Sequence, residues 1–183
     1  LREKYQDLIL VELDRTLIEF WKSQNMNVVA GDALQIDWAF AKGRALVSNL
    51  PYQISSSIVI DRSLEADGLV GMVLMFQKEV AQRIRALCQT EHYGMLSVVA
   101  QEFWTIETVC DAGPRDFKPP PKVASRVLRF VPRQTNVSDR AQYLHFVKAC
   151  FQQRRRVLST NLNALPSKNY DLNRLQSWYE LNK

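Results

Sequence analysis

The sequence contains few of the residues that hold metal ions or form disulfide bonds. Its 183 residues include only three cysteines and two histidines. The cysteines, at positions 88, 110 and 150, are widely separated and form no CxxC pair. This spacing predicts reduced thiols, as in a cytosolic protein, rather than disulfides or a metal site. We therefore expect no metal cofactor.

Long apolar runs are also missing. No run approaches the roughly 18 residues that a membrane-spanning helix requires, so no membrane span is predicted. The first residues, Leu1 to Tyr5, have neither an initiator methionine nor signal-peptide features, and they are typical of the middle of a helix. We expect the natural N-terminus to lie upstream of Leu1. The composition, 46% hydrophobic and 23% charged, suits one globular domain with a modest additional piece.

The net charge of +5 is divided unevenly along the chain. Residues 1–114 carry 10 Lys or Arg and 15 Asp or Glu, a balance of −5. Residues 115–183 carry 14 basic and four acidic residues, a balance of +10. A basic region of this kind is either a solvated surface or a surface that binds a polyanion such as nucleic acid. Charge alone leaves both interpretations open.

Short apolar runs alternate with amphipathic stretches in the front of the chain. This alternation predicts an α/β fold with a parallel, doubly wound sheet. The predicted strands are 7–13, 26–30, 45–48, 69–76, 105–111 and 125–131. A first helix is predicted to begin after Asp14, and three more are predicted at 55–66, 77–88 and 94–103. In the helix 77–88, we expect Val80, Ile84 and Leu87 to face the core.

The rear of the chain is predicted to be helical. Residues 132–136 fit a linker, and from Ser138 apolar residues such as Tyr143, Val147 and Phe151 recur near one helix face. A last short helix is predicted at 171–181. We therefore expect an α/β domain at residues 1–133 and a small basic helical domain at residues 134–183.

Three predicted strands end in polar residues: Glu12, Asp32 and Asn49. Ligands of open α/β sheets bind beyond the carboxyl ends of the strands, where an acid can accept hydrogen bonds from a ribose and a second acid from an adenine. A ribose-binding acid normally follows a glycine-rich loop by about 20 residues, which places that loop upstream of Leu1. Taken alone, Glu12 is also a common helix cap or surface group, and the pair Gly31 and Asp32 is also a common turn.

The segment Asn49–Tyr52 carries the most specific chemistry. Methylation of a base amine is difficult because the nitrogen lone pair is delocalised into the ring. The side-chain oxygen of Asn49 and a backbone carbonyl fixed by Pro51 can hold the amine hydrogens, and Tyr52 offers a face on which an extruded base can stack. Such positioning against an already activated methyl donor needs no strong general base. A plain strand-end turn is the alternative for these four residues.

These motifs resemble the KsgA-type ribosomal RNA adenine dimethyltransferases along nearly the whole chain. The order and spacing of the matching stretches make the resemblance specific. They are Val11–Asp14, Gly31–Ala33, Val47–Ser55, Met75–Val80, Tyr93–Ser97, Phe117–Val123 and Phe151–Arg156. The resemblance implies a Rossmann-like methyltransferase sheet with a basic helical C-terminal domain, and S-adenosylmethionine as the cofactor.

The resemblance also implies roles for single residues. Glu12 is expected to bind the cofactor ribose, and Asp32 is expected to bind its adenine. Asn49 is also expected to contact the cofactor. Asn49 and the backbone of Leu50 and Pro51 are expected to hold the target amine, while Tyr52 and Phe117 sandwich the base. From the sequence alone, a packing anchor of a proline-rich loop is the better interpretation of Phe117, and only the resemblance favours the functional role. The basic residues expected to contact RNA are Lys78, Lys118, Lys122, Arg154, Arg155 and Arg156, for which a solvated surface is the alternative.

In the family, the reaction occurs twice on each of two adjacent adenines, in a hairpin loop near the 3′ end of small-subunit ribosomal RNA. We therefore expect an immature small ribosomal subunit as the partner, recognised by shape and phosphate contacts, and a monomeric protein in the bacterial cytoplasm. This sequence differs from the family in two places. It does not contain the family's N-terminal segment with the glycine-rich loop, and it does not contain the end of the family's helical domain.

Three alternatives remain. Macrolide-resistance methyltransferases share the Asn49–Tyr52 motif but act on large-subunit RNA, and the stretches Gln77–Val80 and Gln152–Arg156 favour the small-subunit branch. DNA adenine methyltransferases use a related four-residue motif but are not expected to carry Phe117–Val123. The third alternative is a ribosome-assembly factor that no longer methylates, against which the intact Asn49 and Tyr52 argue.

Overall fold

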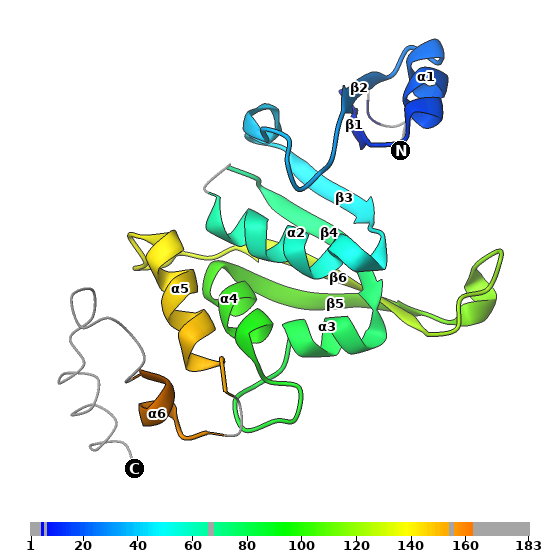
Figure 1. The fold of residues 1–183 in the computed structure, drawn as a ribbon. Helices are drawn as coiled ribbons and strands as arrows, with labels where there is room; N and C mark the ends of the chain where they lie inside the picture. Colours follow the sequence, from blue (N-terminus) through cyan, green and yellow to red (C-terminus); the bar gives the residue numbers. More distant parts are fainter. Residues whose placement is uncertain (1–4, 6, 66–67, 154–155, 163–183) are drawn as a thin grey trace.

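A computed structural model of the protein describes residue 5 and residues 7–65, 68–153 and 156–162. These residues form a mixed α/β structure with two sheets (Figure 1). The smaller sheet pairs β1 (Ile9–Glu12) with β2 (Asn27–Ala30) in parallel. The larger sheet has four strands in the order β3-β4-β6-β5. The α/β class predicted from the sequence is confirmed.

The first unit, β1-α1-β2, is built from local signals. Helix α1 (Arg15–Ser23) begins after Asp14, whose side chain accepts a hydrogen bond from the backbone N–H of Leu17 at 3.0 Å. This bond satisfies one of the amide groups that the first turn leaves free, so Asp14 caps the helix as predicted. After α1, the chain reverses through Asn25, which has a φ of 56°. The reversal brings β2 beside β1 in parallel.

The larger sheet is only partly parallel. Strand β3 (Ala45–Asn49) runs parallel to β4 (Gly71–Gln77), with Asn49 opposite Met75. In contrast, β6 (Ser125–Pro132) is antiparallel to both β4 and β5 (Trp104–Ala112). The prediction of a parallel sheet is therefore wrong for β6, whereas β5 runs in the same direction as β3 and β4. Strands β5 and β6 form a hairpin without a crossover helix, and a direct hairpin connection requires antiparallel pairing.

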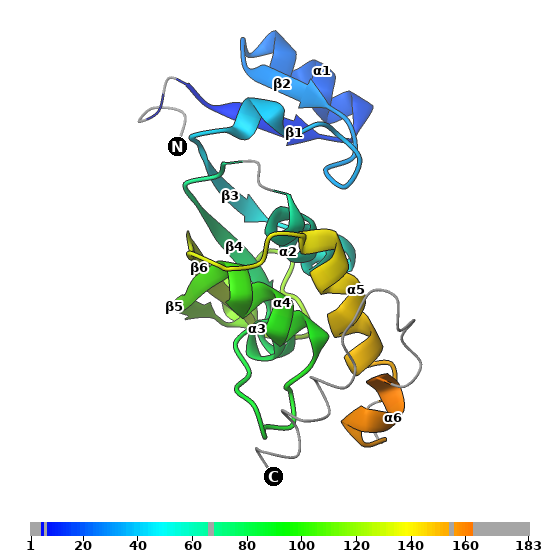
Figure 2. The ribbon, with the colours of Figure 1, turned by 90° about the vertical axis from the view of Figure 1, so that its left-hand side faces the viewer.

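Three helices cover one face of the larger sheet (Figures 1 and 2). They are α2 (Tyr52–Leu64), α3 (Lys78–Ile84) and α4 (Met95–Phe103). Helix α5 (Arg140–Cys150) packs on the outer side of this layer, against α2 and α4. Alternate residues of β4 and β6 point into this interface, where Leu74, Phe76 and Phe130 are fully buried. Burial of such side chains stabilises the fold by about 1.5–3 kcal/mol each. The core therefore lies between the larger sheet and its helices.

Helix α3 ends earlier than predicted. It stops at Ile84, and the side chain of Leu87 is 67% exposed instead of facing the core. The amide of Gln101, from α4, donates hydrogen bonds to the carbonyl oxygens of Ile84 at 3.0 Å and Ala86 at 2.9 Å. These bonds satisfy the free carbonyls of the helix end, so the chain can leave the helix there.

The helical rear of the chain is interrupted after α5. A turn at 151–153 separates α5 from the short helix α6 (Leu158–Leu162), and the amide of Asn161 donates to the carbonyl oxygen of Cys150 at 2.9 Å. Val147 of α5 belongs to the same core as the larger sheet. The domain boundary at residue 133 stays a prediction, and the helix predicted at 171–181 lies outside the described residues.

No helix in the part of the chain that the structure describes is both long and apolar enough to span a membrane.

Candidate functional site

The segment Asn49–Tyr52 joins the carboxyl end of β3 to the start of α2. Leu50 is buried, at 7% exposure, and anchors the segment in the core, while the side chains on both sides of it are exposed. Pro51 precedes the first turn of α2, and its carbonyl oxygen accepts from the N–H of Ile54 at 3.2 Å. Proline fixes the backbone here because its ring restricts φ. The segment is thus a rigid strand-to-helix turn with Asn49 at its edge.

Tyr52 is oriented by a contact from across the sheet. Its hydroxyl lies 3.4 Å from the Oγ of Ser125, the fully buried first residue of β6, and its side chain is 39% exposed. One end of the ring system is therefore fixed while part of the side chain remains available to solvent. This arrangement leaves the ring able to offer surface to a planar ligand.

Glu12 and Asp32 lie at the ends of the two strands of the smaller sheet. Glu12 pairs with Ala30 in register, and its carbonyl oxygen accepts from the N–H of Gly31 at 2.9 Å. Its carboxylate accepts hydrogen bonds from the N–H groups of Leu13 at 2.8 Å and Asp14 at 2.9 Å. Both acids are half-buried. The structure thus places both acids at the same end of two adjacent parallel strands, and their roles toward one ligand stay a prediction.

Phe117 lies in the long connection between β5 and β6, which extends away from the sheet (Figure 1). It follows a short 3-10 turn, Pro114–Asp116, in which the Asp116 carboxylate accepts from the N–H of Gly113 at 2.7 Å. Among the described residues, no ring contact joins Phe117 to Tyr52. A base held between two rings would itself separate them, so the predicted sandwich stays a prediction. Lys118 and Lys122 are exposed on the same connection.

Lys78 begins α3 and belongs to a charged cluster that sequence reasoning missed. Its Nζ lies 3.1 Å from Asp111 of β5, which also accepts two hydrogen bonds from the Arg126 guanidinium of β6, at 2.6 and 2.9 Å. The hydrogen bonds from Arg126, and then those from Lys78, hold the pKa of the Asp111 carboxyl well below its usual range. Only the pairing of β5 with β6 reveals this cluster, because its three residues are distant in the sequence.

Arg156, of the predicted basic triplet, is exposed two residues before the start of α6. Arg154 and Arg155 lie outside the described residues.

Comparison with known proteins identifies the family. The sequence profile described as "Ribosomal RNA adenine dimethylase" matches residues 1–177. The ribosomal RNA small subunit methyltransferase A of Bdellovibrio bacteriovorus is 56% identical over 163 residues, which cover 87% of this chain and 60% of that protein. The probable ribosomal RNA small subunit methyltransferase A of Pyrobaculum islandicum is 38% identical over 161 residues, which cover 86% of this chain and 66% of that protein.

Solved structures agree with this fold. The crystal structure of a dimethyladenosine transferase from Plasmodium falciparum superposes with a TM-score of 0.76 at 26% identity, covering 97% of this chain and 66% of that one. The 23S rRNA methyltransferase ErmE superposes with a TM-score of 0.61 at 24% identity, covering 94% of this chain and 70% of that one, which shows a shared fold. The chain spans 60% and 66% of the lengths of its Bdellovibrio and Pyrobaculum relatives. On the profile match and the identity to its relatives, the chain belongs to the ribosomal RNA adenine dimethylase family.

Proposed function

We propose that the protein transfers methyl groups from S-adenosylmethionine to the exocyclic amines of two adjacent adenines, in a hairpin loop near the 3′ end of small-subunit (16S) ribosomal RNA. The observation that carries this proposal is the rigid turn Asn49–Tyr52 at the end of β3, with Tyr52 fixed by Ser125. The chain's relatives from Bdellovibrio and Pyrobaculum are named for methylation of the small-subunit RNA. An immature small subunit in the cytoplasm is the proposed partner, bound by a monomer.

The residues of the smaller sheet fit the proposed cofactor. Two half-buried carboxylates, Glu12 and Asp32, lie at the ends of adjacent parallel strands, where nucleotide ligands of α/β sheets bind. Carboxylates accept hydrogen bonds from ribose hydroxyls and from an adenine amino group, and we assign these roles to Glu12 and Asp32 respectively. When bound, S-adenosylmethionine supplies a methyl group on a positively charged sulfur, which is already activated for transfer.

The contribution of the protein is to position the target amine. The Asn49 side-chain oxygen and the Leu50 carbonyl oxygen each accept one amine hydrogen, which directs the nitrogen lone pair toward the methyl donor. Burial of the Leu50 side chain and the restricted φ of Pro51 keep this carbonyl in place. The Tyr52 ring, with Phe117 on the opposite side, stacks on the extruded base. Fixing both reactants in this way contributes through orientation rather than through a general base.

Basic residues outside the turn Asn49–Tyr52 are proposed to hold the RNA backbone. Lys78 lies at the end of β4, the neighbour of β3, and Lys118 and Lys122 follow Phe117 on the connection between β5 and β6. Arg154, Arg155 and Arg156 are proposed to bind phosphates from the helical rear. Such contacts give affinity without sequence information, and they weaken as salt concentration rises.

The test is methyl transfer from labelled S-adenosylmethionine to small ribosomal subunits from a strain that lacks this modification. The wild type, with any upstream sequence that its gene encodes, is compared with Asn49→Ala. We expect dimethyladenosine in small-subunit RNA with the wild type only. Transfer to large-subunit RNA instead would replace the proposed substrate by the macrolide-resistance type. Binding to the subunit without transfer to either RNA would leave an assembly factor as the function.

A further inference from the structure

The loop that carries Asp32 is closely folded. One oxygen of the Asp32 carboxylate accepts from the N–H of Leu34 at 2.9 Å, and the Asp32 carbonyl oxygen accepts from the N–H of Ile36 at 3.0 Å. Gly31 begins the loop at a φ of 155°, and a Cβ there would lie 2.6 Å from the Cγ2 of Ile36. The direction of the Asp32 carboxylate therefore depends on the path of residues 31–38.

Trp38 closes this loop from the core side. Its indole N–H donates to the carbonyl oxygen of Ala33 at 3.0 Å, and its side chain is only 4% exposed. Its ring also stacks on Phe40, with 5.6 Å between the centroids. A buried indole N–H requires a partner, and here that partner is the residue directly after Asp32. Movement of the Trp38 ring would therefore displace Asp32.

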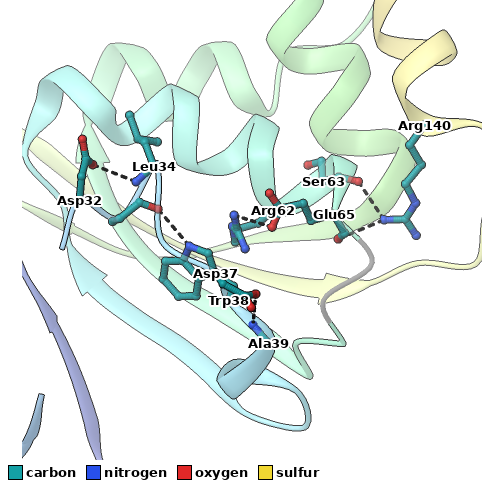
Figure 3. Close-up of polar contacts among 10 residues, drawn as sticks. Asp32, Leu34, Asp37, Trp38, Ala39, Arg62, Ser63, Glu65 and Arg140 are labelled. Atoms are coloured by element: carbon teal, nitrogen blue, oxygen red, sulfur yellow. Dashed lines mark hydrogen bonds and ion pairs between the residues drawn. The ribbon is translucent and has the colours of Figure 1, made fainter. Parts of the chain in front are cut away.

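Arg62, in the last turn of α2, holds the Trp38 ring in place. Its guanidinium carbon lies 4.5 Å from the centroid of that ring, and its side chain is only 2% exposed (Figure 3). An ion pair of 2.8 Å links it to Glu65, which is 56% exposed. A buried guanidinium is stabilised by such a charge partner and by an aromatic face, and it fixes the orientation of both. Arg62 thus connects α2 to the Asp32 loop.

Helix α5 supports the same end of α2. The guanidinium of Arg140 donates to the carbonyl oxygens of Ser63 at 2.9 Å and Glu65 at 3.5 Å (Figure 3). It also lies over the ring of Phe103, at 4.7 Å from the centroid. The segment that presents Arg62 is therefore anchored from a third element, and a continuous set of contacts runs from α5 to Asp32.

We propose that Trp38 and Arg62 are positioning residues of the cofactor site, which set the direction of the Asp32 carboxylate toward the cofactor adenine. This inference rests on the proposed function, because that function assigns the adenine to Asp32. Neither residue needs to touch the cofactor, since each acts through the path of residues 31–38. A purely structural role would change the stability of the protein and leave its affinity for the cofactor unaltered.

The chain contains a matched control for this test. Trp104 is 5% exposed, and its indole N–H donates to the Oγ of Ser63 at 2.9 Å, so this bond reaches the α2 residue next to Arg62 but not residues 31–38. Trp38→Phe and Trp104→Phe each remove one hydrogen bond of a buried indole. Each variant is prepared with any upstream sequence that the gene encodes. Affinity for S-adenosylhomocysteine is measured by titration calorimetry, and stability by thermal unfolding.

We expect both Trp variants to unfold at lower temperature than the wild type. Only Trp38→Phe should weaken S-adenosylhomocysteine binding. The expected loss of affinity is about fivefold, which is the change that loss of one net hydrogen bond produces. Arg62→Met should weaken binding at least as much, and Arg62→Lys, which keeps the charge over the ring, should restore part of it. Affinity for the small subunit should stay unchanged in all four variants. Equal affinity of Trp38→Phe, Trp104→Phe and the wild type would overturn the positioning role.

Asp32→Asn separates this inference from the function on which it rests. If Asp32→Asn weakens binding but Trp38→Phe does not, the positioning role is wrong and the cofactor site stands. If Asp32→Asn binds as tightly as the wild type, or if the wild type binds no S-adenosylhomocysteine, the assignment of the cofactor site itself is wrong and the inference falls with it.

Discussion

The two sheets of the protein hold their proposed site residues in different ways. The turn Asn49–Tyr52 follows a strand whose neighbour, β4, lies in the main core, and Leu50 is itself buried there. In the smaller sheet, α1 has no buried residue, and β1 is half-buried throughout. The carboxylates of Glu12 and Asp32 accept hydrogen bonds from the N–H groups of residues one or two positions away.

The two regions are proposed to serve different purposes, namely positioning of the target amine and binding of the cofactor. The proposed methyl transfer depends on the position of the target amine, and its proposed acceptor groups lie at and next to Leu50, which belongs to the main core. The proposed cofactor carboxylates depend on local turns and on the contact between Trp38 and Arg62. We therefore expect substitutions in the two regions to change different quantities.

The largest expected effect is on catalysis at the packed sheet. Asn49→Ala should lower the rate of methyl transfer by about 10²–10³-fold, the range observed when a single positioning hydrogen-bond group is removed from an active site. The rate is measured as labelled methyl incorporation with saturating RNA. Because the Asn49 side chain is exposed, the midpoint of urea unfolding should hardly change. A large drop in that midpoint would mean that Asn49 is a structural residue.

A pair of leucine substitutions compares the stability of the two regions. Leu74→Ala, at a fully buried position of β4, should lower the free energy of unfolding by about 2–5 kcal/mol, because it leaves a cavity. Leu17→Ala, at 45% exposure on α1, should lower it by less than about 1 kcal/mol. Urea unfolding followed by circular dichroism measures both. Similar losses would show that α1 packs as tightly as the core.

Adding one methyl group at Gly31 tests whether the turn before Asp32 sets the direction of its carboxylate. Gly31→Ala places a Cβ 2.6 Å from the Cγ2 of Ile36, at a φ that suits glycine. We expect about 1–3 kcal/mol lower stability from the strain and the displaced side chain, together with weaker S-adenosylhomocysteine binding. Gly43→Ala is the control, because it also has a positive φ of 74° but meets no atom within 4 Å. Equal binding by both variants would contradict the dependence of the site on this turn.

The smallest effect is expected from the exposed cluster of Lys78, Asp111 and Arg126. The two cations lower the pKa of Asp111 from its ordinary value of 3.8, so the stabilisation is fully present above pH 4 to 5 and is lost as the pH falls through the lower, folded-state value. The stability difference between the wild type and Asp111→Asn should therefore be constant near neutral pH and shrink in acid. Urea midpoints from pH 7 to pH 2.5 measure it.

Glu107→Gln is the matched control for that series, because Glu107 pairs with Arg129 on the same two strands through one longer contact of 3.3 Å. Its effect at pH 7 should be smaller than that of Asp111→Asn. A difference for Asp111→Asn that grows as the pH falls would have the wrong sign for a lowered pKa and would contradict the cluster as described.

Much of the fold could be predicted because its signals are local. The run ending at Glu12, the cap at Asp14 and the turn at Gly31 define β1-α1-β2 within a few residues, and the structure agrees with them. The motif Asn49–Tyr52 was found in the same way, as a polar turn after an apolar strand. Each of these patterns depends on backbone geometry over one or two turns.

The rest depended on contacts between distant residues. The amide of Gln101 ends α3 before Leu87, and hairpin pairing makes β5 and β6 antiparallel; no local periodicity indicated either. Local sequence thus determined the strand ends and the residue types that the proposed chemistry needs. Only the tertiary structure decided that Asp111 meets Lys78 and that Arg62 supports Trp38, because register and packing bring together side chains that the sequence separates.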